Sequence, residues 1–253
     1  MGVIVGIGGG RMTDLETLTI DKEIVSFTGL ESPNALYIPT ASYDSPEKWD
    51  EFRGIYGDKL GCKTDVLYLL GETPSYDELT SKILSAHIIY VAGGNTLKMM
   101  MRWRLLGVDK ILDKAFENGT VLSGTSAGML CWFKFGHSDS RSFYGRENWN
   151  YIKVRGLGYI NAIGCPHYNS ESEGAALGAL RSNDFKKMIR SKQDIGIAVD
   201  NHAAFMVVDN KYKVLSSKSG SGVYRLRKLN NEIVEEKLDQ TNSLQDISTL
   251  INQ

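Results

Sequence analysis

The sequence has only three cysteines, Cys62, Cys131 and Cys165, and its formal net charge is −1. Three scattered cysteines are too few for a disulfide framework or a zinc site, and they are typical of reduced thiols in a cytoplasmic protein. A charge near zero excludes a global field that would attract nucleic acid or an anionic membrane. The chain also lacks an apolar run long enough to span a bilayer. Its first residues, Met-Gly-Val-Ile-Val-Gly-Ile, are typical of a strand and not of a signal peptide.

What is present is ordinary for a globular protein: 253 residues, of which 42% are apolar and 23% charged. This length is enough to bury a substantial core. The chain has no internal repeat, and no linker rich in proline, glycine or serine divides it. We therefore expect a single domain over residues 1–253.

Short apolar runs alternate with helical spacing through the first two thirds of the chain. Strands are expected at 3–7, 34–38, 65–70, 88–92 and 120–123. Helices are expected at 12–27, 46–56, 76–84, 97–106 and 108–118. Because continuously apolar strands are buried on both faces, this alternation predicts an α/β fold with a mostly parallel twisted sheet and helices on both faces. Such sheets bind ligands at the carboxyl ends of their strands.

The last third of the chain has a different pattern. Strands at 158–163 and 195–199 enclose a helix at 172–190, and a closing helix is expected at 243–251. Three further apolar runs, at 204–208, 212–216 and 222–226, follow one another with short turns between them. This close succession predicts an antiparallel extension at the edge of the sheet.

Residues 122–128 read Leu-Ser-Gly-Thr-Ser-Ala-Gly and carry the clearest chemical signal. The Gly-x-Ser-x-Gly pattern lies between an expected strand and a helix-like stretch at 127–133, which is the context of a nucleophile elbow. Such a turn exposes the Ser126 hydroxyl and directs the Ala127 amide toward the position of an oxyanion. The alternative is an ordinary strand-to-helix turn in which the serine caps the helix.

A serine nucleophile needs a base, and the chain has four histidines. His167 follows an expected strand, and the rigid Pro166 before it would fix its direction; the alternative is a loop histidine without a catalytic task. The base in turn needs an acceptor on its second ring nitrogen. Asp200, which ends the strand at 195–199, is the first candidate and Asp139 is the second. Either could instead be a solvated turn aspartate.

A second oxyanion donor is expected from a backbone amide on a neighbouring strand-to-helix loop. The segment Gly93-Gly94-Asn95-Thr96 lies at such a position, and the alternative is a helix start that Asn95 or Thr96 caps. The glycines within 6–10 also follow a strand, but they match neither the dinucleotide-binding nor the P-loop spacing. A structural turn is therefore expected there.

A long polar and aromatic loop spans residues 138–146. Loops of this kind often bind substrate in α/β enzymes. Arg141 or Arg146 could clamp a substrate carboxylate through two parallel hydrogen bonds. The alternative is a solvated loop.

Three motifs together resemble the peptidase E and cyanophycinase family of serine peptidases. They are Gly-Gly-Asn-Thr at 93–96, Gly-Thr-Ser-Ala-Gly at 124–128 and Pro-His-Tyr at 166–168. Their order and spacing match the family over most of residues 1–210. The resemblance implies a class I glutamine amidotransferase-like (flavodoxin-like) fold in which serine replaces the cysteine nucleophile.

The resemblance also assigns the site roles: nucleophile Ser126, base His167, and oxyanion donors Gly94 and Ala127. The third member is implied at Asp200, with Asp139 as the competitor. The cyanophycinase branch carries Asp-Glu where this chain has Asp200-Asn201. Cyanophycin hydrolysis is therefore disfavoured, because asparagine cannot supply the same charge. The loop at 138–146 does not resemble the aspartate-selecting region of peptidase E.

The hypothesis is a cytoplasmic serine peptidase or amidase that uses a Ser-His-Asp triad and an acyl-enzyme. Short peptides are the expected substrates, with dipeptides that carry an N-terminal acidic residue as candidates. We expect no metal or organic cofactor, no nucleic-acid or membrane partner, and a monomer or homodimer. The alternative is a catalytically degenerate binding or sensing protein on the same fold. An esterase is disfavoured, because α/β-hydrolases place the acid before the histidine.

Overall fold

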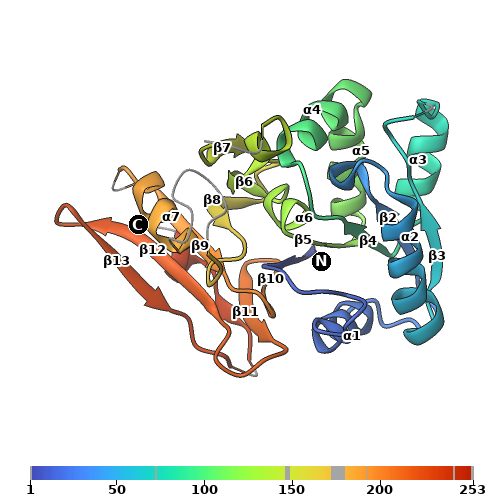
Figure 1. The fold of residues 1–253 in the computed structure, drawn as a ribbon. Helices are drawn as coiled ribbons and strands as arrows, with labels where there is room; N and C mark the ends of the chain where they lie inside the picture. The colour runs from blue at the N-terminus through green and yellow to red at the C-terminus, as the bar shows by residue number, and fades with distance from the viewer. Residues whose placement is uncertain are drawn as a thin grey trace.

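The computed structural model describes residues 2–71, 73–145, 149–171, 180–191, 193–241 and 243–251. Its strands form two sheets (Figure 1). The first contains β1 (Val3–Ile7), β2 (Asn34–Ile38), β3 (Lys63–Val66), β4 (Ile88–Val91), β5 (Val121–Thr125), β10 (Ala203–Val208), β11 (Lys211–Ser216) and β14 (Gln245–Asp246). The second contains β6 (Phe133–Ser138), β7 (Ile152–Arg155), β8 (Ile160–Cys165), β9 (Ile195–Val199), β12 (Val223–Leu229) and β13 (Glu232–Lys237).

The helices follow in chain order. They are α1 (Leu18–Ser26), α2 (Pro46–Phe52), α3 (Tyr76–Leu84), α4 (Thr96–Leu106), α5 (Val108–Glu117), α6 (Ala127–Leu130), α7 (Arg181–Met188) and α8 (Ser248–Ile251). A π-helix, Arg53–Lys59, continues α2. In the described part of the chain, no helix is both long and apolar enough to cross a membrane.

The eight-stranded sheet has the order β14-β11-β10-β1-β5-β4-β2-β3. Its members β1, β5, β4, β2 and β3 are parallel, and β10, β11 and β14 add an antiparallel edge. The carboxyl ends of the parallel strands therefore lie at one edge, where ligands bind in sheets of this kind. The expected strands 3–7 and 34–38 are confirmed with these bounds.

The expectation of a single sheet is wrong for the second half of the chain. The six-stranded sheet, of order β13-β12-β9-β8-β6-β7, takes β8 and β9 as parallel neighbours. The helix expected at 127–133 ends at Leu130, and β6 begins at Phe133. The residues of β6 include lysine, glycine and histidine, so they lack the apolar pattern by which strands were recognised. The antiparallel extension is consequently divided: β10 and β11 join the first sheet, and β12 and β13 join the second.

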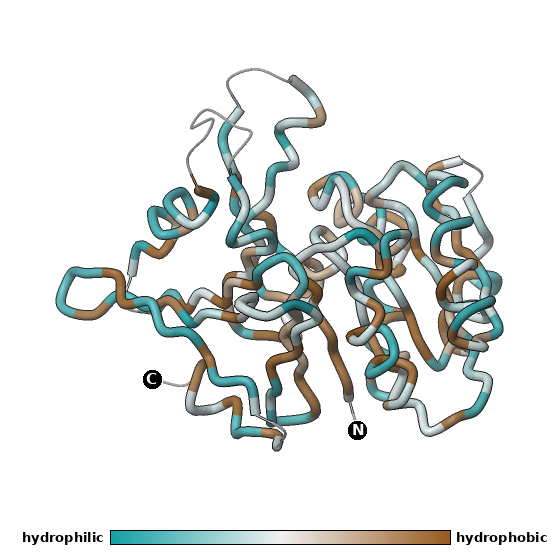
Figure 2. Tube along the Cα trace, turned by 60° about the horizontal axis from the view of Figure 1, so that its bottom comes forward, coloured by the Kyte–Doolittle hydropathy of each residue, from teal (hydrophilic) through white to brown (hydrophobic). Residues whose placement is uncertain are grey.

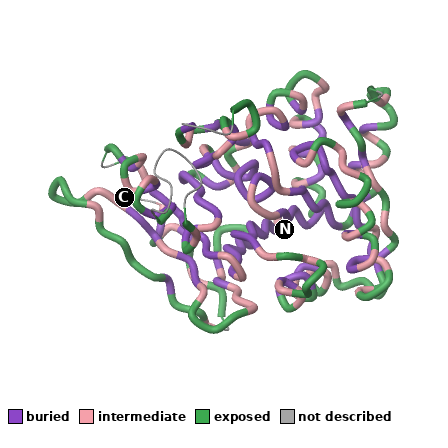
Figure 3. The backbone as a smooth tube through the Cα atoms, viewed as in Figure 1, coloured by how far each residue is buried: buried purple, intermediate pink, exposed green. Residues whose placement is uncertain are grey.

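Side chains alternate along the strands of the first sheet, so each face has its own apolar cluster. Ile4 and Leu36 pack with α3, α4, α5 and residues of the second sheet. Val3 and Val5 pack with α1 and the helical segment after β2. Figure 2 shows hydrophobic residues concentrated along the central strands, and Figure 3 shows the same strands buried. Helices cover one face of the first sheet, and helices together with the second sheet cover its other face. This packing holds the carboxyl ends of the strands in place.

Candidate active site

Ser126 lies in the sharp turn between β5 and α6. Its backbone has φ 55° and ψ −109°, a strained combination for a residue with a side chain. The turn is held because the Ser126 amide donates to Ile7 O, at the end of β1, over 3.0 Å. The flanking glycines allow this packing, since a Cβ atom on Gly124 or Gly128 would collide with the carbonyl oxygen of Val91 in β4. The sequence pattern therefore places the serine hydroxyl at the carboxyl edge of the first sheet.

His167 comes from the second sheet, two residues after β8. Its Nε2 lies 2.9 Å from Ser126 Oγ, so the sheets bring together two side chains that are 41 residues apart. The backbone of His167 is also left-handed, with φ 52°. Its amide donates to Gly8 O over 3.1 Å, which ties the histidine turn to the loop after β1.

The second ring nitrogen of His167 contacts Asn201 and neither of the two expected aspartates. Nδ1 lies 2.6 Å from Asn201 Oδ1, and Asn201 Nδ2 donates to Ser170 Oγ over 2.8 Å. With Oδ1 as the acceptor, the ring proton is on Nδ1 and Nε2 accepts the Ser126 hydroxyl proton. The ring is thus held in the tautomer that a general base requires.

The side chain of Asp200 does not contact His167 as expected, because the chain turns sharply after β9 and Asn201 takes that position. Its Oδ2 accepts the Gly222 amide over 3.0 Å, and burial raises the pKa of this carboxyl. Asp139 lies on the other side, 3.8 Å from a guanidinium nitrogen of Arg181, and reaches His167 only through its charge. Asp200 therefore stabilises the turn that presents Asn201.

Burial, together with the smaller effect of the Arg181 charge, lowers the pKa of His167 to about 4. The hydrogen bond to Asn201 acts in the opposite direction. A histidine with this pKa is neutral at pH 7, so the form that accepts a proton is fully populated. A neutral asparagine supplies no charge that would raise the pKa.

The glycine loop after β1, which contains Gly8 and Gly9, packs against His167 and Asn201. Gly8 O accepts the His167 amide, and Gly9 O accepts the His202 amide over 2.8 Å. A Cβ atom on Gly9 would overlap Asn201 Oδ1 and His167 Nδ1. The structural turn expected here is confirmed, and its glycines leave room for the bond between the two side chains.

The two expected oxyanion donors lie on the loops beside Ser126. Among the described residues, the amides of Ala127 and Gly94 have no protein acceptor. Gly94 has φ 133°, and a Cβ there would collide with Ala41 O. Asn95 caps α4 by accepting the Lys98 amide over 3.0 Å. Capping and a free glycine amide thus coexist in one loop.

Two cavities adjoin His167. The serine cleft, of about 460 Å³, contains Ser126 and is lined also by Gly93 and Thr125 beside it, by Tyr37 and Tyr90 from β2 and β4, and by Arg11, Lys48 and Glu51. The arginine cavity, of about 250 Å³, is lined by Asp139, Ser142, Trp149, Tyr151, Ser170, Glu171 and Arg181. His167 is a lining residue of both cavities.

Arg181, the first residue of α7, is only 4% exposed. One guanidinium nitrogen donates to His137 O over 2.8 Å, and the group lies 4.7 Å from the centre of the Tyr151 ring. Its Nε has no hydrogen-bond partner in the described part of the chain. The helix is held by a 2.9 Å bond between His137 Nε2 and Asp184 Oδ1. A buried cation with an unused donor therefore lines the cavity behind His167.

Of the two arginines expected to clamp a carboxylate, the structure describes only Arg141. Arg141 is exposed and lines a different cavity with Lys153 and Arg190. Arg146 lies outside the described residues.

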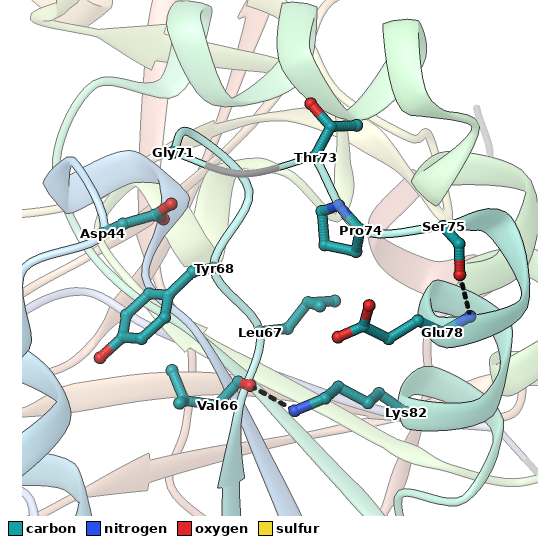
Figure 4. Close-up of a pocket in the computed structure, with 10 residues that line it drawn as sticks. All are labelled: Asp44, Val66, Leu67, Tyr68, Gly71, Thr73, Pro74, Ser75, Glu78 and Lys82. Atoms are coloured by element: carbon teal, nitrogen blue, oxygen red, sulfur yellow. Dashed lines mark hydrogen bonds between the residues drawn. The ribbon is translucent and has the colours of Figure 1, made fainter.

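A further cavity, of about 570 Å³, lies at the end of β3 (Figure 4). It does not include Ser126, and its Lys82 pairs with Asp65 at 2.9 Å. Among the described residues, no three His, Cys, Asp or Glu side chains could hold a metal ion.

Sequence reasoning missed Asn201, Arg181 and the contact of Gly9. Asn201 directly follows the expected acid, Asp200. Its amide oxygen can accept a hydrogen bond from a ring N–H with the same geometry as a carboxylate oxygen. Arg181 falls in the helix expected at 172–190, where its charge is typical of a solvated face. The sequence carries no signal that sets Arg181 apart, because Asp184 three residues later is typical of an exposed ion pair on a helix.

Known proteins resemble the chain along almost its entire length. The sequence model of peptidase family S51 matches residues 4–215. YgaJ, an uncharacterized peptidase of Bacillus subtilis strain 168, is 32% identical over 238 residues, which are 93% of this chain and 96% of YgaJ.

Two solved structures share the fold. A peptidase from an acI-B1 actinobacterium superposes with a TM-score of 0.70 at 19% identity, covering 97% of each chain. A putative peptidase E from Listeria monocytogenes EGD-e superposes with a TM-score of 0.60 at 18% identity, covering 94% of this chain and 100% of the other.

Proposed function

Because the chain belongs to peptidase family S51 and is a serine peptidase, we propose that it hydrolyses short peptides with Ser126, His167 and Asn201. The observation that carries the proposal is the pair of hydrogen bonds on one imidazole, 2.9 Å to the serine Oγ and 2.6 Å to the asparagine Oδ1. A base within this reach of the hydroxyl, oriented by a third group, is the arrangement that activates a serine.

In the proposed reaction, Ser126 Oγ attacks the amide carbonyl carbon while His167 Nε2 takes the hydroxyl proton. The amides of Ala127 and Gly94 stabilise the oxyanion that forms. The imidazolium then gives its proton to the amine as the C–N bond breaks, which leaves an acyl ester on the serine. Water attacks this ester, His167 accepts the water proton, and release of the acid restores the serine hydroxyl.

The polar groups of the arginine cavity favour an acidic N-terminal residue as the acyl part. Such a residue carries a side-chain carboxylate and an α-ammonium group. The buried Arg181 supplies a guanidinium charge for the first, and the carboxylates of Asp139 and Glu171 line the same cavity for the second. In this proposal Arg181 has the role that the sequence assigned to Arg141 or Arg146.

The finer description of the fold belongs to the same proposal. Parallel strands β1, β5, β4 and β2 with helices on both faces support a class I glutamine amidotransferase-like arrangement. One apolar cluster contains residues of both sheets, which supports a single domain over 1–253. The cysteines are free and buried, which supports a reducing, cytoplasmic location.

The test combines labelling and hydrolysis. A fluorophosphonate is expected to modify Ser126, and a screen of Asp-X, Glu-X and X-Asp dipeptides is expected to show turnover of the first two classes. Mass spectrometry of the labelled peptide identifies the modified residue. Absence of both labelling and turnover, together with a tightly bound metabolite, would instead favour a sensing protein on this fold.

Exchanging Asn201 for aspartate is expected to move the pH profile. His167 works in its neutral form, so kcat/KM of the wild type falls as the pH drops through the pKa of about 4. A carboxylate at position 201 favours the imidazolium, so Asn201→Asp raises this pKa by roughly 1–3 units and the acid limb moves to higher pH. The measurement is kcat/KM between pH 3.5 and 8, with thermal unfolding recorded at each pH.

The matched control is Asn118→Asp, an equal change of charge on an exposed residue beyond the end of α5. It is expected to leave the acid limb in place. An unchanged limb in Asn201→Asp would show that residue 201 does not contact the working base.

Arg181→Met is expected to change substrate preference more than reactivity. Loss of a charge-assisted hydrogen bond costs about 1.5–3 kcal/mol, so the kcat/KM ratio of Asp-Leu to Asn-Leu should fall roughly 10- to 100-fold. The fluorophosphonate labelling rate reports separately whether Ser126 and His167 remain assembled. Arg53→Met, a change at an exposed ion pair, is the control. An unaltered ratio in Arg181→Met would remove the arginine from substrate recognition.

A further inference from the structure

The serine cleft has a rigid aromatic floor. Tyr37 and Tyr90 are partners in the pairing of β2 with β4, and they are only 4% and 2% exposed. The ring centroid of Tyr37 lies 4.6 Å from that of Phe52 in a stacked arrangement, and Tyr90 lies 5.6 Å from the same ring. These contacts leave the two tyrosines little freedom to move, so the floor of the cleft is a preformed aromatic surface.

The rim of the cleft carries more positive than negative charge. Arg11 and Lys48 line it, and Glu51 is the one acidic side chain among its described lining residues. Lys48 Nζ donates to both carboxylate oxygens of Glu51, at 2.9 and 2.8 Å. The Lys48 side chain is 51% exposed, and such a surface pair contributes little free energy. The ammonium can therefore exchange its partner or bind a second carboxylate with its remaining proton.

We propose that the serine cleft binds the leaving residue of the substrate, and that Lys48 selects leaving residues with a free α-carboxylate and an apolar side chain. This inference rests on the proposed function, in which the arginine cavity holds the acyl residue on the other side of His167. The cleft volume of about 460 Å³ is within the range of small-molecule sites. The leaving side chain packs on Tyr37 and Tyr90, and its carboxylate faces Lys48.

The chemistry of this cleft distinguishes dipeptides from longer peptides. The leaving residue of a dipeptide ends in a carboxylate, which forms a charge-assisted bond with an ammonium group. In a longer peptide the same position is a neutral amide, which gains much less from Lys48. The cleft thereby makes the enzyme prefer dipeptides without a wall that blocks longer chains.

The experiment compares Asp-Leu with Asp-Leu-amide, which differ only at the group that faces Lys48. The wild type is expected to cleave the free acid with a kcat/KM about 10-fold or more above that of the amide. Lys48→Met should remove most of this difference by slowing cleavage of the acid alone, and Lys48→Arg should retain it. Because the methionine variant leaves Glu51 unpaired, the double variant Lys48→Met/Glu51→Gln separates lost attraction from new repulsion.

Lys22→Met, a change at an exposed lysine of α1 outside the cleft, is the control and should keep the wild-type ratio. Equal rates for acid and amide in the wild type, or a ratio that survives Lys48→Met, would overturn the inference while hydrolysis itself persists. Failure of the proposed function has a different signature, namely no cleavage of either compound and no fluorophosphonate label on Ser126.

Discussion

Ser126→Ala is expected to lower kcat for dipeptide hydrolysis by about 10⁴- to 10⁶-fold, the largest effect that any single substitution in this chain should have. Alanine removes the only atom that can form the acyl ester, and His167 Nε2 then has no hydroxyl to deprotonate. The Cβ atom and the strained turn are kept, so the melting temperature should stay within a few degrees of the wild type. The measurement is turnover of Asp-Leu together with thermal unfolding.

Ser123→Ala is the matched control for this substitution. Ser123 belongs to β5, the strand that leads into Ser126, and its hydroxyl donates to Ile89 O over 3.1 Å inside the sheet. Its loss should cost about 1 kcal/mol of folding free energy and leave turnover intact. Substantial hydrolysis by Ser126→Ala, in protein free of wild-type enzyme, would refute the nucleophile assignment.

Gly9→Ala is expected to lower kcat/KM by about 10²-fold or more while the protein remains folded. The added methyl group would occupy the space of the bond between Asn201 Oδ1 and His167 Nδ1, so the asparagine or the ring must move. Displacement of a catalytic group by about 1 Å costs on the order of 10²-fold in rate. The φ angle of Gly9 is not positive, so alanine causes no backbone strain there. Kinetics and fluorophosphonate labelling should both decline.

Gly54→Ala provides the comparison, because a Cβ at Gly54 meets no atom within 4 Å. Alanine in this helical segment should keep full activity and raise stability by about 0.4–1 kcal/mol. A fully active Gly9→Ala enzyme would mean that the contact between His167 and Asn201 is not needed for turnover.

The helices and strands follow from local physical chemistry wherever the apolar pattern is strong. The expected elements 3–7, 34–38, 76–84 and 195–199 are confirmed with these bounds, because short β-branched runs and a serine-capped helix specify themselves. Strands β6, β7 and β13 were not expected. Their residues mix charged with apolar side chains, since β7 and β13 are edge strands with one solvated side.

In the candidate site, too, local features could be predicted from the sequence and contacts between distant segments could not. A tight turn with glycines on both sides of Ser126 is a local feature, so the sequence alone predicts that the serine hydroxyl and the Ala127 amide lie at such a turn. The histidine was found because Pro166-His167 follows a strand end. The third partner depends on how the turn after β9 rotates, and a rotation by one residue exchanges Asp200 for Asn201.

By itself, the sequence determined the α/β alternation, the serine turn and the histidine, because each depends on neighbours within a few residues. Only the tertiary structure decided that residues of two sheets meet at Ser126, that Asn201 contacts the imidazole of His167, and that Arg181 is buried. These outcomes depend on contacts between segments tens of residues apart. Such contacts are chosen by packing of the whole chain, which leaves no trace in local spacing.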